Sequence, residues 1–368
     1  MPTVLHVTQP TESGVAVYVS ELCADQAARG WDVVVACPDR GRLATDLLRH
    51  GISRIGWEAE RNPGAQVFPE WLGLRQILDR MSPDVVHLHS SKAGMAGRLA
   101  AQGRLPTLFQ PHGWSWLAAP RGMARAALAW ERCAARWTTL FVCVGEGEAR
   151  QGRDHRLHGR YAIAHNGVDL EKFQPAEERD RLAARDRVGI PREVPLAVCV
   201  GRVTRQKGQD VLLAAWPAVS ARRPDARLAI LGGGELRGPL RRQASAGVIF
   251  AGAVDDVRPW YAAADVVVLP SRWEGLPLTL LEALAVGCPV VGSNIPGIAE
   301  ELPVGAGALV PAGDAAALAE AVGHRLCRRD AARAEGVVGA RYAAATADVR
   351  RTHEVVAGVT AHVGGWTP

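Results

Sequence analysis

Residues 265–293 of the chain read DVVVLPSRWEGLPLTLLEALAVGCPVVGS. Two short apolar runs, Asp265–Pro270 and Pro289–Ser293, enclose a segment long enough for a helix. Both runs are continuous rather than alternating in polarity, which is typical of strands covered on both faces of a parallel sheet. The stretch therefore predicts a strand, a helix and a second parallel strand.

The same pattern recurs in two series along the chain. The further apolar runs are Val4–Val7, Val33–Cys37, Asp84–His89, Thr107–Gln110 and Leu140–Val144, and then Leu196–Gly201, Leu228–Gly232 and Val248–Gly252. A polar stretch without strand pattern separates the series, and we set the boundary near Pro175. We expect an α/β protein with two Rossmann-like doubly wound domains, residues 1–175 and 176–345, and a terminal helix in 346–368. Ligands of such sheets bind beyond the carboxyl ends of the strands, so the domains should face each other across a cleft.

Length and composition limit the classes of protein. A chain of 368 residues with 48% hydrophobic and 22% charged residues is too long for one core and too apolar for disorder. The net charge is +5, but no run of five or six basic residues occurs, so we predict no nucleic-acid partner. Seven cysteines without a C-x-x-C pair, and an amino terminus without a signal-peptide pattern, predict a cytoplasmic protein with reduced thiols.

Two glutamates accompany the helix that we expect to begin at Pro277. Glu274 lies in the preceding loop and Glu282 about a turn inside the helix. The amide groups at a helix amino terminus favour an anion, and a carboxylate beside them can accept hydrogen bonds from sugar hydroxyls. The alternative is that Glu274 caps the helix and Glu282 is solvated.

Two positive side chains follow the first strand of the second series. Arg202 and Lys207 lie in the loop GRVTRQKG, where they could hold a diphosphate, and Lys207 is one of only three lysines. The alternative for Lys207 is a solvated loop charge. Gly234, in the GGGE motif, would let the backbone approach a ligand. This motif lacks the G-x-G-x-x-G order, which disfavours a nicotinamide dehydrogenase.

The first series carries a glycine and several histidines at strand ends. Gly14 would bring an anion to a helix amino terminus, and His112 could bind a hydroxyl or handle a proton. His87 and His89 share a strand face, but without a carboxylate or cysteine at ligand spacing we predict no metal. An amphipathic basic helix over 120–140, with Met123 on its apolar stripe, favours packing on the sheet over peripheral membrane contact.

Taken in order, these motifs resemble the retaining GT-B glycosyltransferases that carry two glutamates separated by seven residues, a bacterial sugar-nucleotide-dependent group. The resemblance runs from about Val4 to about Asp330. It rests on SGV (13–15), HSSKAG (89–94), PHGW (111–114), NGVD (166–169), GRVTRQKG (201–208), GGGE (232–235), PSRWEGLP (270–277) and GIAE (297–300). Two positions depart from the family pattern: Ser13 replaces a glycine, and Ala299 replaces a proline.

The resemblance implies a role for each matching residue. His112 and Glu274 would be catalytic. Contacts with the nucleotide sugar would come from Gly14, Arg202, Lys207, Gly234, Gly275, Leu276, Leu278 and Glu282. Acceptor binding would fall to His89, Lys92 and Trp114, and the terminal helix would cross back to the first domain.

The implied activity is transfer of a sugar, with retention of configuration, from a nucleotide diphosphate sugar to a hydroxyl. We expect a UDP-sugar as donor and a lipid-linked glycan, a polysaccharide precursor or a small natural product as acceptor. No metal or other cofactor is expected, and the enzyme would act in the cytoplasm, at the inner face of the membrane if contact occurs. The alternatives are a sugar-nucleotide epimerase on the same fold and a non-catalytic sugar-nucleotide-binding subunit.

Overall fold

The computed structural model describes residues 1–60 and 66–367, which form two compact units. Unit 1 comprises Met1–His165 and Arg350–Pro368, and unit 2 comprises Asn166–Val349. The boundary predicted near Pro175 therefore lies inside unit 2. The reason is that the chain joins unit 2 earlier, since Val168 forms a β-bridge with Asp348.

Unit 1 contains a seven-stranded parallel sheet in the order β3-β2-β1-β4-β5-β6-β7. The strands are β1 (Thr3–Thr8), β2 (Asp32–Cys37), β3 (Ser53–Gly56), β4 (Val85–His89), β5 (Thr107–Gln110), β6 (Leu140–Cys143) and β7 (Tyr161–Ile163). The helices are α1 (Ser13–Ala28), α2 (Arg42–Arg49), α3 (Val67–Met81), α4 (Ser90–Ala101), α5 (Ser115–Ala118), α6 (Arg121–Ala134), the 3-10 turn η1 (Ala135–Trp137) and α7 (Glu146–Asp154).

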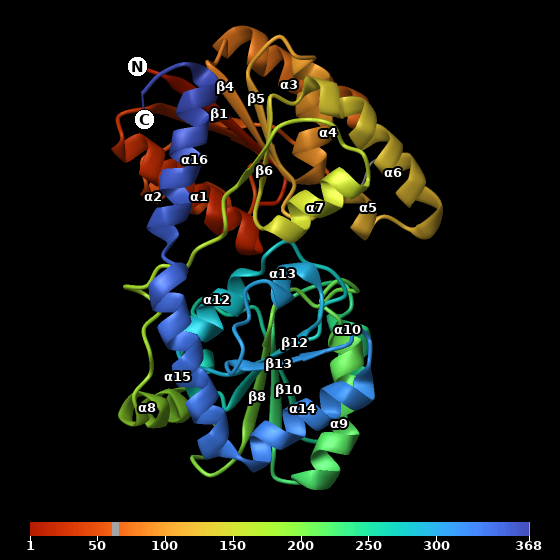
Figure 1. The fold of residues 1–368 in the computed structure, drawn as a ribbon, viewed down its shortest axis with the longest axis vertical. Helices are drawn as coiled ribbons and strands as arrows, with labels where there is room; N and C mark the ends of the chain where they lie inside the picture. Colours follow the sequence, from red (N-terminus) through yellow and green to blue (C-terminus); the bar gives the residue numbers. More distant parts are fainter. Residues whose placement is uncertain (61–65, 368) are drawn as a thin grey trace. The chain divides into compact units, whose positions relative to one another are not determined.

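The carboxyl-terminal helix α16 (Val349–Gly364) packs on unit 1, beside α1 and α2 (Figure 1). Its buried residues Val356, Ala357 and Ala361 belong to the same apolar cluster as Leu22 of α1. The sequence pattern placed one helix from about Thr346, but helix α15 ends there and α16 begins after a short break.

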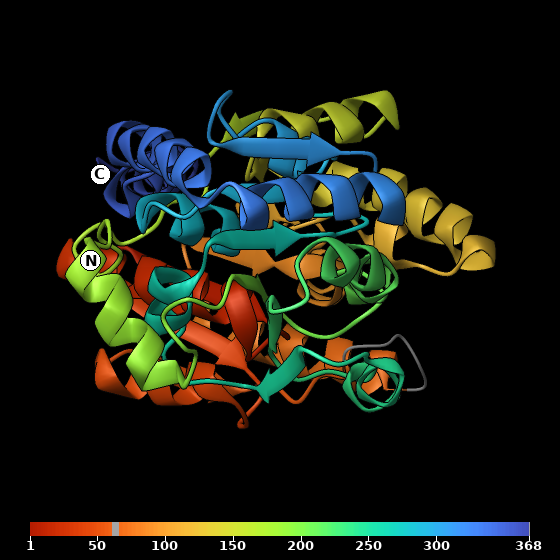
Figure 2. The same ribbon diagram turned by 90° about the horizontal axis from the view of Figure 1, so that it is seen from below.

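Unit 2 contains a six-stranded parallel sheet in the order β10-β9-β8-β11-β12-β13. The strands are β8 (Leu196–Val200), β9 (Arg227–Leu231), β10 (Val248–Gly252), β11 (Val266–Leu269), β12 (Val290–Ser293) and β13 (Gly307–Val310). The helices are α8 (Glu178–Val188), α9 (Gln209–Arg222), α10 (Arg237–Gln243), α11 (Arg258–Ala263), α12 (Leu278–Ala285), α13 (Pro296–Ala299), α14 (Ala315–Cys327) and α15 (Arg329–Thr346). Helix α14, in blue, lies along this sheet (Figure 2).

Both sheets have the doubly wound order, which confirms the predicted fold class. In each unit the first strand along the chain lies beside the fourth, β1 beside β4 and β8 beside β11. The connections leave in opposite directions at this point, so the loops after these strands are free to bind a ligand. In unit 2 these are the loops that begin with Gly201 and Pro270.

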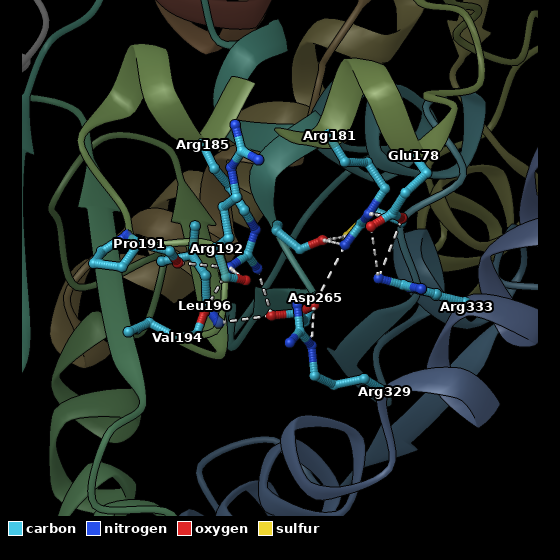
Figure 3. A network of polar contacts seen from close by, with 12 residues as sticks. Glu178, Arg181, Arg185, Pro191, Arg192, Val194, Leu196, Asp265, Arg329 and Arg333 are labelled. Carbon is cyan, nitrogen blue, oxygen red and sulfur yellow. Dashed lines mark hydrogen bonds and ion pairs between the residues drawn. The ribbon is translucent and has the colours of Figure 1, made fainter. Parts of the chain in front are cut away.

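At the amino-terminal ends of the unit 2 strands, a buried ion-pair network surrounds Asp265 (Figure 3). This carboxylate accepts hydrogen bonds from Arg181, Arg185 and Arg329, and from the backbone N–H of Leu196. The network joins α8 and α15 to the amino-terminal ends of β8 and β11. It lies away from the loops at the carboxyl ends of the strands, so its role is structural.

Helix α6 differs in detail from its predicted pattern. Met123, assigned to the packed stripe, is 52% exposed. Ala127 of the same predicted stripe does pack against the core, together with Ala124 and Leu128. Glu131 also turns inward and pairs with the buried Arg98 at 2.6 Å. The packed face therefore keeps Ala127 and Ala134 of the predicted stripe and leaves out Met123. Among the described residues, none of the helices combines the length and the apolar character that spanning a bilayer requires.

Candidate functional site

The loop after β8 is fixed against the loop after β11. Gly208 has a φ of +67°, and a Cβ there would lie 2.0 Å from the carbonyl oxygen of Pro270. Only glycine fits this close approach without a shift of the backbone. Arg272 strengthens the junction, since its guanidinium pairs with Asp210 at 2.6 Å.

This junction brings Lys207 to Glu274. The Lys207 ammonium lies 2.6 Å from Glu274 Oε1, and the two side chains are 18% and 7% exposed. Ser271 Oγ donates to the same oxygen at 2.7 Å, and Gln206 Nε2 donates to Oε2 at 3.3 Å. Glu274 is therefore an ion-pair partner in the loop and does not cap α12. A buried carboxylate with several donors is held in one orientation.

The turn before α12 presents backbone at the same sheet edge. The helix begins at Leu278 with Pro277 as its N-cap, one residue later than predicted, and no side chain caps it. The carbonyl oxygen of Leu276 accepts a hydrogen bond of 2.6 Å from Asn166 Nδ2. Gly275 meets the start of α13, where a Cβ on Gly297 would lie 1.6 Å from the Gly275 carbonyl oxygen. The turn is thus fixed on both sides.

Glu282 and Gly234 have defined partners. Glu282, half-buried in α12, accepts a hydrogen bond of 2.8 Å from the hydroxyl of the buried Tyr261. Gly234 has a φ of +145°, and a Cβ there would lie 2.4 Å from the carbonyl oxygen of Val203. The GGGE motif therefore packs on the loop that carries Arg202 and Lys207. Arg202 is half-buried in that loop, and its carbonyl oxygen accepts from Gln209 Nε2 at 3.1 Å.

In unit 1, Gly14 is exposed in the first turn of α1, as predicted for a helix amino terminus. Ser13, which replaces a glycine of the family pattern, has a φ of +64°. This is the left-handed region that glycine adopts without steric cost. The departure seen in the sequence is thus a serine held in a glycine conformation.

Histidines form a connected group at the carboxyl ends of β1, β4 and β5. His6 Nδ1 lies 3.0 Å from His89 Nε2, and His89 Nδ1 lies 3.2 Å from His112 Nε2. Burial lowers the pKa of His6 to about 4, and loss of water around the ring lowers the pKa of His112 to about 3. Burial also holds the pKa of His89 well below its usual range, so all three rings are neutral at pH 7.

Two side chains assigned to acceptor binding have structural partners instead. Lys92 is 5% exposed and pairs with the buried Glu70 at 2.8 Å. Trp114 is 1% exposed in the apolar core, and its Nε1 donates to the carbonyl oxygen of Glu148 at 2.7 Å. Their burial leaves little surface for an acceptor. His89 is also fully buried, and its ring contacts other histidines.

The sequence pattern paired His87 with His89 but missed a third histidine beside them, His6. His6 lies on β1 opposite His87 of β4, so the sheet brings both to one face. Ligand atoms of His6, His87 and His89 lie within 4.8 Å of one another, an arrangement that could hold a metal ion. The absence of a metal stays a prediction. The sequence did hold a signal for His6. It lies two residues after Val4 in the predicted first strand, so both side chains are on the same face of that strand.

Comparisons with known proteins identify the family of the chain. The profile described as "Glycosyltransferase Family 4" matches residues 13–172, and "Glycosyl transferases group 1" matches residues 194–327. A D-inositol 3-phosphate glycosyltransferase from Nocardiopsis dassonvillei is 30% identical over 376 residues, covering 92% of this chain and 87% of the relative.

A second relative is the Escherichia coli UDP-Gal:alpha-D-GlcNAc-diphosphoundecaprenol alpha-1,3-galactosyltransferase, 32% identical over 240 residues. That match covers 61% of this chain and 62% of the relative, which is less than two thirds of its length. Among solved structures, sucrose-phosphate synthase from Thermosynechococcus elongatus has a TM-score of 0.84 at 22% identity, covering 99% of this chain and all of that one. The sequence relationship over nearly the whole length, with two doubly wound sheets, shows that the chain belongs to the bacterial glycosyltransferases of the GT-B fold.

Proposed function

We propose that the protein is a retaining glycosyltransferase that moves a sugar from a nucleotide diphosphate sugar, a UDP-sugar in the first instance, to a hydroxyl acceptor. The observation that carries this proposal is the Lys207–Glu274 ion pair at the switch point of the unit 2 sheet. It joins the Lys207 ammonium, which is suited to binding a phosphate, to the Glu274 carboxylate, which is suited to accepting hydrogen bonds from sugar hydroxyls. The E. coli relative, whose name specifies UDP-Gal, supports the choice of uridine.

In this proposal the loops of unit 2 hold the donor. Lys207 and Arg202 bind the diphosphate, Glu274 accepts hydrogen bonds from the sugar, and Glu282 accepts them from the ribose. The backbone at Gly14, Gly234, Gly275, Leu276 and Leu278 approaches the sugar and the phosphates. Breaking the anomeric C–O bond places negative charge on the leaving diphosphate, which the two cations and the amino terminus of α12 stabilise. The proposed mechanism therefore uses no metal ion.

His112 is proposed to lie beside the reacting sugar. The sugar ring gains positive character as the bond breaks, so a charged imidazolium would oppose the reaction. The low pKa of His112 keeps its ring neutral and able to accept a hydrogen bond from a hydroxyl. A same-face attack, in which the leaving phosphate oxygen takes the acceptor proton, accounts for retention without a carboxylate nucleophile.

For the acceptor, we propose a hydroxyl of a lipid-linked glycan reached at the cytoplasmic face of a membrane. The name of the E. coli relative specifies an acceptor of this class. The exposed Met123 on the arginine-rich helix α6 supports peripheral contact with an anionic surface. A polysaccharide precursor and a small natural product are the other acceptor classes to be tested.

The test is release of nucleoside diphosphate from a panel of UDP-, GDP- and ADP-sugars, each with and without lipid-linked, polysaccharide and small-molecule acceptors. We expect release with a UDP-sugar, and proton NMR of the product should show the anomeric configuration of the donor. Lys207→Ala and Glu274→Ala should each lower turnover by about 10²-fold or more. Arg205→Ala, which removes an exposed cation from the same loop, should not.

Each alternative has its own outcome in this panel. A donor sugar altered without any acceptor would identify an epimerase. Nucleotide-sugar binding in calorimetry with no turnover for any acceptor would identify a binding subunit. Normal turnover in both the Lys207 and Glu274 variants would reject the proposed site, and an inverted product would reject the retaining mechanism.

A further inference from the structure

A chain of hydrogen bonds runs through the interior of unit 1 and ends at His112. It begins at the side chain of Gln26 on α1, whose Oε1 lies 2.7 Å from His6 Nε2. It continues from His6 Nδ1 to His89 Nε2 at 3.0 Å and from His89 Nδ1 to His112 Nε2 at 3.2 Å. We name Gln26, His6, His89 and His112 the imidazole chain. Its first three members are fully buried, and His112 is half-buried.

The first link fixes the direction of every other link. A carboxamide oxygen only accepts a hydrogen bond. His6 Nε2 therefore carries the proton and donates the hydrogen bond to Gln26 Oε1. A neutral imidazole has one N–H, so His6 Nδ1 accepts from His89 Nε2–H. By the same step, His89 Nδ1 accepts from His112 Nε2–H. The remaining ring nitrogen, His112 Nδ1, is left with its lone pair.

The residues around the imidazole chain keep its rings neutral. Among the described residues, the other titratable side chains in ring contact with the imidazole chain are Tyr18, whose ring centroid lies 5.0 Å from that of His112, and His87, at 4.1 Å from His89. Burial raises the pKa of Tyr18 and lowers that of His87 well below its usual range, so neither is charged at pH 7. A proton added to His6 or His89 would leave two N–H groups facing each other at one of the links.

The backbone also fixes His112, the last member of the imidazole chain. His112 has a φ of +52°, a conformation that residues with a Cβ rarely adopt. The next residue is held by Glu148, whose Oε1 accepts from the Gly113 N–H at 2.6 Å and whose Oε2 accepts from the Val144 N–H at 2.9 Å. A strained residue held by a buried carboxylate on one side and by a histidine on the other is positioned with little freedom.

We propose that the buried part of the imidazole chain positions His112 and sets its tautomer, so that His112 Nδ1 presents a lone pair to a hydroxyl of the bound sugar. Gln26, His6 and His89 are then positioning residues that touch no substrate. This reassigns His89 from acceptor binding to the support of His112. The inference rests on the proposed function only for the identity of the hydroxyl, because the tautomer is a property of the free protein.

The test measures the tautomer directly by long-range proton–nitrogen NMR of the protein labelled with ¹⁵N at histidine. A His112→Gln variant identifies the signals of His112. In the wild-type protein at pH 7.5 we expect His112 to be protonated at Nε2 and unprotonated at Nδ1. Gln26→Met removes the first acceptor with little change of shape, and His6→Phe breaks the chain at the next link. Either change should give a mixture of both tautomers.

His87 supplies a matched control. It is a buried histidine on the same strand as His89, and neither of its ring nitrogens has a hydrogen-bond partner in the described part of the chain. His87→Leu should leave the tautomer of His112 unchanged. In the transfer assay, Gln26→Met and His6→Phe should lower kcat about tenfold and leave the KM for the donor within about twofold, whereas His87→Leu should change neither. Circular dichroism checks that each variant is folded.

Several results would overturn the inference. These are a His112 protonated at Nδ1 in the wild type, a tautomer that survives both Gln26→Met and His6→Phe, or a change in KM alone. Zinc bound stoichiometrically to the wild type and lost in His87→Leu would show that the buried histidines form a metal site and not the imidazole chain. If the expected tautomers are found but no nucleotide sugar is turned over, the proposed function fails and the positioning of His112 stands.

Discussion

The ammonium of Lys207 lies 2.6 Å from a carboxylate oxygen of Glu274, although 67 residues separate them along the chain. They meet because β8 and β11 are parallel neighbours, and the loops after both strands leave at the same edge of the sheet. The pair satisfies both charges before any ligand arrives. A diphosphate that binds Lys207 must therefore compete with Glu274.

This competition predicts opposite effects of Glu274→Gln on binding and on turnover. Removal of the negative charge should tighten binding of the nucleoside diphosphate by about tenfold, because Lys207 loses its charged partner. Turnover of the nucleotide sugar should fall, because the amide is a weaker acceptor for the sugar hydroxyls. Calorimetry with UDP and the transfer assay measure the two effects.

Glu235→Gln is the control for the change in net charge, since Glu235 is exposed in the neighbouring GGGE motif. It should alter UDP affinity by less than about twofold. Weaker UDP binding by Glu274→Gln would contradict the competition.

Gly208→Ala should damage both stability and activity. The added methyl group would meet the carbonyl oxygen of Pro270 at 2.0 Å, and the φ of +67° adds about 1 kcal/mol of backbone strain. Relief of the clash must move the loop that carries Lys207, so kcat/KM should fall along with the free energy of unfolding. Denaturant titration and the transfer assay measure both. Gly233→Ala, where a Cβ meets nothing within 4 Å, should leave stability within about 0.5 kcal/mol.

Asp265→Asn should destabilise the protein without altering the chemistry. It removes the charge that balances Arg181, Arg185 and Arg329, and Arg185 is only 2% exposed. An unbalanced buried charge lowers the free energy of unfolding by about 3 kcal/mol or more. Chemical denaturation measures the loss, and kcat of the folded variant should stay close to the wild-type value.

Asp256→Asn serves as the comparison, because its pair with Arg258 is partly exposed, at 27% and 47%. The expected loss there is about 1 kcal/mol or less. Equal losses for the two variants would show that the Asp265 network is no more important than a surface pair.

The buried histidines predict that acid weakens the fold of unit 1. The unfolded chain binds a proton at His6 below pH 6.5, whereas the folded chain binds it only near pH 4. The unfolded state therefore holds more protons in this window, and the free energy of unfolding falls as the pH decreases through it. For a fully buried group the loss reaches about 3 kcal/mol. Urea unfolding at pH 7, 6, 5 and 4.5 measures the slope.

His6→Phe should make this slope shallower without abolishing it, since it removes one titrating group while burial also lowers the pKa of His87, His89 and His112. His50→Gln, which removes an exposed imidazole of the same unit, should leave the slope as in the wild type. A wild-type slope that does not change in His6→Phe would show that His6 takes up no proton in this pH range.

The central strands and the edge strand β10 were predictable from the sequence, whereas the edge strands β3, β7 and β13 were not. In the central strands the runs of Val, Ile and Leu residues are covered on both faces, which is why their pattern is continuous. The strands β3 (SRIG), β7 (YAI) and β13 (GALV) are short, lie at sheet edges and have few fully buried residues, so their sequences differ little from those of loops. The boundary between the units lies before Val168, whose bridge to Asp348 joins residues remote in sequence and so leaves no local pattern.

The sequence by itself determined the fold class and the edge of the sheet at which Lys207 and Glu274 meet, because strand patterns and the loops that follow them are local properties of the chain. Only the tertiary structure decided what each side chain contacts. Gln26 reaches His6 across a helix–sheet interface, and Trp114 lies in the core. Such contacts depend on distances between segments remote in sequence. No local pattern of residues encodes them, so a motif can name a residue without fixing its partners.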